Sequence, residues 1–163
     1  MKSKNYRSIR GQLYTREKYI HGAPDARIVK FSMGEEKPDY NLEITLNANE
    51  RLLMRDNALE AVRMSANRNL GKLLGSDYLF QIMVYPHHVL RENKMMTGAG
   101  ADRLQEGMRR AFGKKVGRAA VLNRGQPIVS VKTYAENEGK VRRILKIAAS
   151  KVPKGVYVDV HPL

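Results

Sequence analysis

Short hydrophobic runs separated by polar turns occupy most of the chain, and they predict strands. These runs cover residues 26–33, 40–46, 78–85, 116–122, 127–134 and 156–160. The stretch GEEKPD separates the first two, and Pro86 ends the third because proline cannot continue a central strand. The stretch NRGQ between the fourth and fifth runs predicts a tight hairpin.

Two longer stretches follow a helical period instead. The first begins near Asn49 and repeats apolar residues at spacings near three and four, with Asn47 or Asn49 as its expected cap and Gly71 as its expected stop. Its apolar side consists of Leu52, Leu59, Val62 and Ala66. The second covers residues 136–151, with acids early and bases late, as the helix dipole favours. Its apolar side consists of Val141, Ile144, Leu145 and Ala148.

Strands on both sides of two long helices indicate an α+β fold, with a mixed or antiparallel sheet backed by the two main helices. The length of 163 residues predicts a single domain, residues 1–163, because a chain of about 150 residues can bury roughly two thirds of its unfolded surface. Residues 1–20 carry positive charge without an apolar core, so we interpret them as a basic N-terminal arm rather than a signal peptide.

Residues 85–124 differ from the rest of the chain because they are basic, rich in glycine and almost without hydrophobic period. From Arg91 to Arg124 nine lysines and arginines face three acids. Such a segment cannot bury itself, so residues 91–115 are predicted to be a long basic loop that contacts a polyanion. Within it, residues 102–112 could form a short helix with Leu104, Met108 and Phe112 on one side, although Gly107 weakens that prediction.

The charge of the whole chain favours nucleic acid as the partner. Thirty lysines and arginines against sixteen acids give a net charge of +14. The chain has no cysteine, which excludes disulfides and cysteinyl zinc sites. No apolar run approaches the roughly 18 residues of a membrane span, so no membrane partner is expected. No catalytic arrangement of residues stands out, and we expect neither an enzyme nor a cofactor nor a small-molecule substrate.

The adjacent histidines His87 and His88 are candidates for base stacking, phosphate contact or simple packing. Neighbours in an extended segment point to opposite faces, so no metal site is predicted. Gly98, Ala99 and Gly100 form either a flexible turn or a place where a ligand approaches the backbone closely. Met95 and Met96, beside them, have no period and suggest an exposed apolar tip.

The remaining cations and aromatics leave two readings open. Arg109, Arg110, Lys114 and Lys115 form either a solvated face or, as their density beside a loop favours, a set of phosphate contacts. Tyr6, Tyr14 and Tyr19 lie beside basic residues and either stack on unpaired bases or anchor the arm to the core.

Three stretches carry a resemblance to a known family: YTREKYIHGAPDARIVKFSMG, DNALEAVRMSANRNL and YPHHVLRENKMMTGAGADRLQEGMRRAFGK. Together they resemble the archaeal and eukaryotic large-subunit ribosomal protein ten-e family, the counterpart of bacterial large-subunit protein sixteen. The resemblance implies an α/β-hammerhead fold in the cytoplasmic large ribosomal subunit. It further implies binding to ribosomal RNA near the central protuberance, with 5S rRNA and neighbouring ribosomal proteins as further partners. Eukaryotic relatives carry a longer basic C-terminal extension, so we expect the archaeal form.

The resemblance makes residues 95–108 a loop that reaches toward the peptidyl transferase centre and the tRNA acceptor arm. The tRNA-proximal residues are Met95, Met96, Thr97, Gly98, Ala99, Gly100, Ala101, Asp102, Arg103, Leu104 and Gln105. The full set of predicted RNA-binding residues, from the resemblance and from local charge, is Arg10, Tyr14, Thr15, Arg16, His87, His88, Arg91, Lys94, Arg103, Arg109, Arg110, Lys114, Lys115 and Arg118. The alternative is a transient RNA-binding factor of ribosome assembly.

Overall fold

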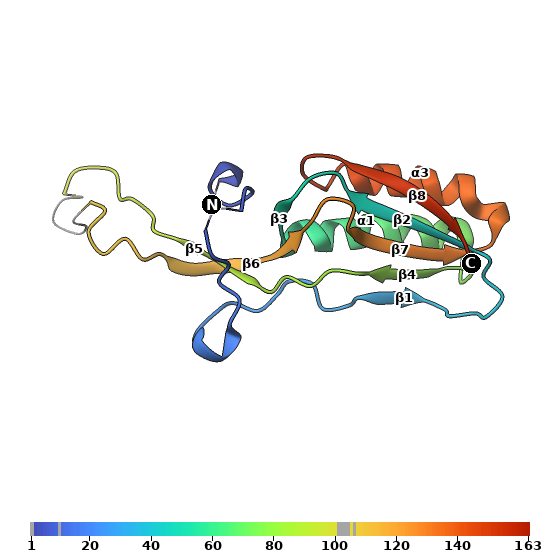
Figure 1. Cartoon of the computed structure of the whole chain (residues 1–163), viewed down its shortest axis with the longest axis horizontal. Coiled ribbons are helices and arrows are strands. Elements are labelled where there is room, and N and C mark those ends of the chain that lie inside the picture. Colours follow the sequence, from blue (N-terminus) through green and yellow to red (C-terminus); the bar gives the residue numbers. More distant parts are fainter. Residues whose placement is uncertain (1, 10, 101–104, 106) are drawn as a thin grey trace.

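The computed structural model describes residues 2–9, 11–100, 105 and 107–163. Two helices cover one face of a five-stranded sheet, and a three-stranded sheet leads from it toward a long loop at the opposite end of the molecule (Figure 1). Every strand pair in both sheets is antiparallel. The predicted α+β class with two main helices is therefore confirmed.

The five-stranded sheet has the order β1-β4-β7-β2-β8. Its strands are β1 (Ser32–Gly34), β2 (Leu42–Ala48), β4 (Leu79–Ile82), β7 (Pro127–Thr133) and β8 (Val156–Pro162). Ile44 of β2 lies opposite Val131 of β7, which in turn lies opposite Phe80 of β4. All three side chains are fully buried, because this face of the sheet packs against the helices.

Helices α1 (Asp56–Leu74) and α3 (Glu138–Ala149) bury the apolar sides that their periodicity predicts. Every residue predicted for the apolar side of α3 is buried. In α1 the predicted stop at Gly71 is wrong, because the helix continues for another turn. Its C-cap is Gly75, whose φ of 63° suits glycine and whose N–H donates to the Gly71 carbonyl.

The predicted start of the first helix near Asn49 is also wrong. Leu52 begins a strand, β3 (Leu52–Arg55), and α1 starts only at Asp56 with Arg55 as its N-cap, so neither Asn47 nor Asn49 caps it. The residues of β3 are buried on successive positions, so their pattern resembles a buried helix segment in the sequence. β3 belongs to the three-stranded sheet, which it forms with β6 (Lys114–Leu122) and β5 (His88–Glu92) in the order β3-β6-β5.

The predicted hairpin at NRGQ is wrong for a topological reason. β6 pairs with β3 and β7 pairs with β2, so β6 and β7 lie in different sheets. Residues 42–55 and 119–133 instead form one long antiparallel ribbon that bends between the two sheets. At the bend the Ala48 N–H donates to the Gln126 carbonyl at 3.0 Å, and the Gly125 N–H donates to the Ala48 carbonyl at 2.8 Å. NRGQ is thus a turn within one strand of the ribbon.

Residues 26–31 are not the strand that their composition predicts; only residues 32–34 pair as β1. The Arg27 N–H donates to the Asp56 carboxylate at 3.1 Å, and the Ile82 N–H donates to the Phe31 carbonyl at 2.8 Å. These contacts tie the segment to the start of α1 at one end and to β4 at the other. Ile28 is buried between them in the main hydrophobic cluster.

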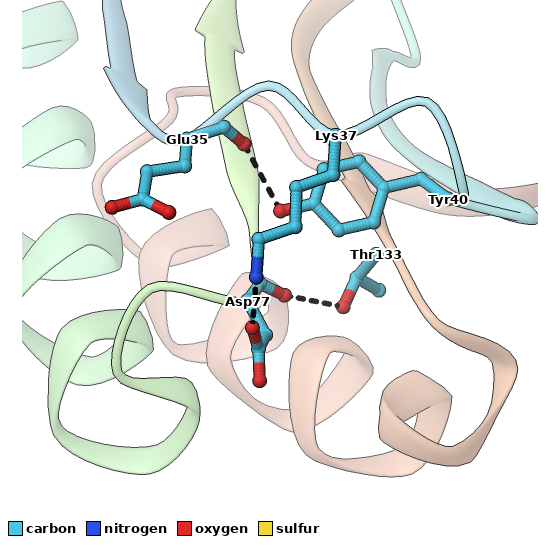
Figure 2. Close-up of polar contacts among 5 residues, drawn as sticks. All are labelled: Glu35, Lys37, Tyr40, Asp77 and Thr133. Carbon is cyan, nitrogen blue, oxygen red and sulfur yellow. Dashed lines mark hydrogen bonds and ion pairs between the residues drawn. The ribbon is translucent and has the colours of Figure 1, made fainter.

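A polar cluster closes the end of the five-stranded sheet that lies away from the basic loop (Figure 2). Lys37 Nζ donates to the Asp77 carboxylate at 2.6 Å, and Thr133 Oγ1 donates to the Asp77 carbonyl at 3.0 Å. The Tyr40 hydroxyl donates to the Glu35 carbonyl at 3.0 Å. The hydrogen bond from Lys37 to Asp77 raises the pKa of the lysine. The turn between β1 and β2 is thereby fastened to the connection between α1 and β4.

Candidate nucleic-acid interface

Residues 93–113, which we call the basic loop, leave the three-stranded sheet between β5 and β6 and project to one end of the molecule (Figure 1). Its described residues form neither helix nor strand. Gln105 joins its outgoing and returning halves: its side chain accepts a hydrogen bond from the Met96 N–H at 2.6 Å and donates one to the Lys94 carbonyl at 3.2 Å. The Gln105 side chain therefore connects the two halves of the basic loop through hydrogen bonds.

The outer half of the basic loop is exposed, as its composition predicts. About half of the Met95 and Met96 side chains is exposed, 52% and 51%. Gly98 and Gly100 have φ of 128° and 79°, the region that favours glycine, and both lie in open space. Residues Thr97 to Gly100 are all exposed. The glycines here form a turn, and a Cβ at either position would meet no neighbouring atom.

The helix predicted over residues 102–112 falls partly on residues 102–104 and 106, which lie outside the described residues. Gln105 and residues 107–112 are turn or irregular, because Gly107 and Arg110 both have positive φ, 58° and 55°. Lys94, Arg109, Arg110 and Lys114 are exposed. Ala101, Asp102, Arg103 and Leu104 lie outside the described residues.

Arg91 stands at the root of the basic loop between two aromatic rings. Its guanidinium carbon lies 4.1 Å from the centroid of the Phe112 ring and 4.7 Å from that of the Tyr14 ring. The two rings are themselves arranged edge to face, with centroids 6.4 Å apart. A cation between two ring faces gains electrostatic attraction while its outer N–H groups stay available. This trio joins the N-terminal arm to the returning half of the basic loop.

The N-terminal arm comprises residues 1–20, and its described residues are folded onto the three-stranded sheet. The Arg7 carbonyl accepts the Leu53 N–H at 2.8 Å, and the Tyr14 carbonyl accepts the Val89 N–H at 2.9 Å. The apolar side chains of Tyr6, Ile9 and Leu13 pack on a small cluster of Leu53, Leu90 and Ala119. Thr15 and Arg16 are exposed, whereas Arg10 lies outside the described residues. Of the two readings of Tyr6 and Tyr14, the structure therefore shows anchoring of the arm.

A cavity of about 660 Å³ lies between the N-terminal arm and the root of the basic loop. Its lining includes Lys4, Gln12 and Asn93 on the polar side, and Ile9, Leu13 and Phe112 on the apolar side. Mixed polar and aromatic walls beside exposed cations are suited to a nucleotide, whose base is flat and whose phosphate is charged.

The two histidines have different surroundings. His88 is half-buried, and its Nδ1 accepts the Tyr14 N–H at 2.9 Å, so this ring is packed and holds the arm. Burial lowers the pKa of His88, and the positive charge of Arg91 lowers it further. His87 is exposed, and its ring lies 4.6 Å from that of Tyr85.

Two of the predicted RNA-binding cations make internal contacts. The Arg118 side chain is 8% exposed, donates to Glu17 at 2.7 Å through Nη2, and donates to the Pro24 carbonyl at 2.8 Å through Nε. Its hydrogen bond to Glu17 raises the pKa of Arg118 and lowers that of Glu17. Lys115 donates to the His21 carbonyl. In this conformation both side chains fasten residues 17–24 to β6, and their contact with RNA stays a prediction.

The structural roles of three residues were not predicted from the sequence: Phe112, Gln105 and Glu17. Phe112 was predicted to lie on a helix. The available sequence signal for its role at the loop root is its position directly before Gly113, at the end of a glycine-rich stretch. Glu17 is the only acid among residues 1–20, which is a signal for an internal ion pair. Gln105 has no sequence signal, because its partners are backbone atoms.

No cation site emerges from the part of the chain that the structure describes, where no group of three or more histidines and acids converges. Within the same part of the chain, no helix is long and apolar enough to cross a membrane.

The chain was also compared with known proteins. Residues 9–158 match the family model for ribosomal protein L16p/L10e. The chain is 46% identical to the large ribosomal subunit protein uL16 of Hyperthermus butylicus over 158 residues, which is 96% of this chain and 88% of the relative. It is 42% identical to uL16 of Metallosphaera sedula over 97% of this chain and 92% of the relative, and 46% identical to uL16 of Staphylothermus marinus over 97% and 91%. The chain therefore belongs to the L16p/L10e family of ribosomal proteins.

Proposed function

We propose that this chain is a structural, non-enzymatic constituent of the large ribosomal subunit in the cytoplasm and binds ribosomal RNA through the basic loop and the N-terminal arm. The observation that carries the proposal is the basic loop itself, which projects from the body with exposed cations and is anchored at its root by Arg91, Tyr14 and Phe112. The relatives that the chain resembles over nearly all of its length are named as large ribosomal subunit proteins.

The chemistry of the exposed side chains supports RNA rather than an acidic protein as the partner. Lysine and arginine neutralise phosphates and release counterions, and the planar guanidinium offers paired donors to phosphate oxygens. The exposed cations Lys94 and Arg110 lie on the outgoing and the returning half of the basic loop, so both halves can contact phosphates.

The finer part of the proposal concerns where the basic loop goes. Its outer half, including Met95, Met96 and Gly98, would reach the tRNA acceptor arm and the peptidyl transferase centre, while the body contacts ribosomal RNA near the central protuberance, 5S rRNA and neighbouring ribosomal proteins. The described residues 97–100 of this half are small, exposed and outside any helix or strand, which supports this, since such a segment fits between closely spaced RNA strands.

The test uses matched charge changes in the full chain. In one variant Lys94, Arg110 and Lys114 become glutamine; in the control Lys140, Arg143 and Lys146, exposed cations of α3 at the other end of the molecule, become glutamine. Binding to a large-subunit rRNA fragment is measured from low to physiological salt. The loop variant should lose affinity and lower the logarithmic salt slope by roughly two to three, while the control changes little. Equal effects of the two variants would refute a binding role specific to the basic loop.

A further inference from the structure

A second aromatic surface lies outside the basic loop. The rings of Phe31 and Tyr85 are stacked with centroids 5.5 Å apart and 28° between their planes, and the His87 ring continues the series 4.6 Å from Tyr85. We call these three rings the aromatic ladder. The Tyr85 side chain is 43% exposed, and its neighbours Met83 and Val29 are 52% and 81% exposed.

The backbone beneath the aromatic ladder is held in place by hydrogen bonds. Ile82 N–H donates to the Phe31 carbonyl at 2.8 Å, which ties the two segments that carry the ladder to each other. Met83 N–H donates to the Ile128 carbonyl at 2.9 Å, and Val84 is buried. The rings therefore sit on a preorganised support, so a ligand that stacks on them orders little of the protein on binding.

The segment that carries Phe31 is positively charged. Lys30 immediately precedes Phe31 and is exposed, and Arg27 is exposed on the same segment. Residues 16–31 contain four lysines and arginines and two acids. One of these acids, Glu17, is paired with Arg118 and interacts electrostatically with His87. Stacked rings beside cations match a base and its phosphate.

We infer that the aromatic ladder is a stacking platform for an unpaired RNA base, with Tyr85 as its central ring, His87 as its exposed end ring and Lys30 beside the phosphate. This inference rests on the proposed function and deepens it: the chain recognises a single-stranded element of its RNA partner at a place separate from the basic loop. Stacking on a tyrosine tolerates any base, so the site selects unpaired nucleotides rather than a sequence.

The experiment uses the full chain, a single-stranded RNA of ten nucleotides with a central 2-aminopurine, and an RNA duplex of ten base pairs. Quenching of 2-aminopurine reports stacking, and fluorescence anisotropy reports affinity. Tyr85→Leu should reduce the quenching and weaken single-strand binding about tenfold while duplex binding changes little. Tyr85→Phe should retain both signals. Tyr157→Leu is the matched control, because Tyr157 is 44% exposed on β8 at the far edge of the five-stranded sheet and should behave as wild type.

Thermal unfolding of Tyr85→Leu checks that the variant is folded, as its exposed position predicts. Unchanged quenching and affinity in folded Tyr85→Leu would overturn the inference and leave this surface to a protein partner. In that case the proposed function stands if the variant with Lys94, Arg110 and Lys114 replaced still loses salt-dependent RNA affinity. Failure of the wild-type chain to bind either RNA would overturn both.

Discussion

Glu17 and Arg118 are 101 residues apart in the sequence, yet the Glu17 carboxylate lies 2.7 Å from Nη2 of Arg118. The acid is on the 3-10 helix η2 (Glu17–Tyr19) of the N-terminal arm, and the base is on β6, one strand of the basic loop's root. The arginine side chain is 8% exposed and the glutamate side chain 71%. The arm is thus pinned to the strand that leads away from the loop by a cation that is mostly buried.

Replacing Arg118 with methionine should lower the free energy of unfolding by about 1–2 kcal/mol. The change removes the hydrogen bonds to Glu17 and to the Pro24 carbonyl, and hydrogen bonds to charged groups contribute more than neutral ones. Arg142→Met is the control, because its 3.4 Å pair with Glu138 is on the surface and should contribute less than about 0.5 kcal/mol. Urea unfolding measures both, and a smaller effect for Arg118→Met than for Arg142→Met would contradict the prediction.

Protonation of His88 should loosen the N-terminal arm. Burial lowers the pKa of His88 below its ordinary value of 6.5, so below about pH 6.5 the unfolded chain binds more protons than the folded one. The free energy of unfolding is therefore highest above that pH and falls as the pH drops through the lowered pKa. A protonated Nδ1 also cannot accept the Tyr14 N–H.

An NMR titration of the His88 ring and hydrogen exchange at the Tyr14 amide measure this effect between pH 7 and 5. His88→Leu should remove the pH dependence of arm attachment, and His87→Leu should keep it. Titration of His88 above pH 6.5 would show that the folded state favours the charged ring, contrary to the prediction.

Gly113 should not tolerate a side chain. A Cβ at this position would lie 2.7 Å from the Glu92 carbonyl carbon and 2.8 Å from the Glu92 nitrogen, and neither backbone atom can move without opening the strand pair at the loop root. Gly113→Ala should therefore cost about 1–3 kcal/mol in thermal or urea unfolding. Gly139→Ala is the control: it lies in α3 with no atom within 4 Å of its Cβ, and it should be neutral or stabilising by up to about 1 kcal/mol.

Deleting residues 97–105 should leave the body folded while impairing accommodation of tRNA in assembled subunits. The described residues of this segment contribute nothing to either hydrophobic cluster, and residues 97–100 are exposed. Circular dichroism and thermal unfolding of the free chain, together with tRNA binding to reconstituted subunits, measure the two effects. Loss of the cooperative transition would show instead that the segment is needed for folding.

The periodicity of the sequence was sufficient to predict that there are two helices and which side of α3 is buried, but not the bounds of α1 or the pairing of the strands. Val141, Ile144 and Leu145 repeat at helical spacing and are all buried, because one amphipathic helix needs only local information. β6 and β7 were joined as a hairpin since a short turn favours local pairing, whereas β6 pairs with β3 and β5, and β7 pairs with β2 and β4. Pairing of that kind depends on distant strands, which composition does not encode.

The basic loop was predictable because its charge and glycine content leave it no way to be buried, and its described residues are indeed outside the core. The contacts that shape it were not predictable. The Arg91 guanidinium contacts the ring of Phe112 from the returning half of the loop and the ring of Tyr14 from the N-terminal arm. For Arg118 the charge density around it suggested an exposed side chain. The side chain is instead 8% exposed and pairs with Glu17, an acid far away in the sequence.

The ribbon of residues 42–55 and 119–133 joins the two sheets, because each of its strands runs from one sheet into the other. Both strands pass from one sheet to the other at the same bend, where Ala48 is hydrogen-bonded to residues 125 and 126. Bending at that point would have to break two hydrogen bonds. These two hydrogen bonds connect the two strands of the ribbon at the bend between the sheets. A partner that binds α1 and α3 would therefore also orient the basic loop at the other end of the molecule.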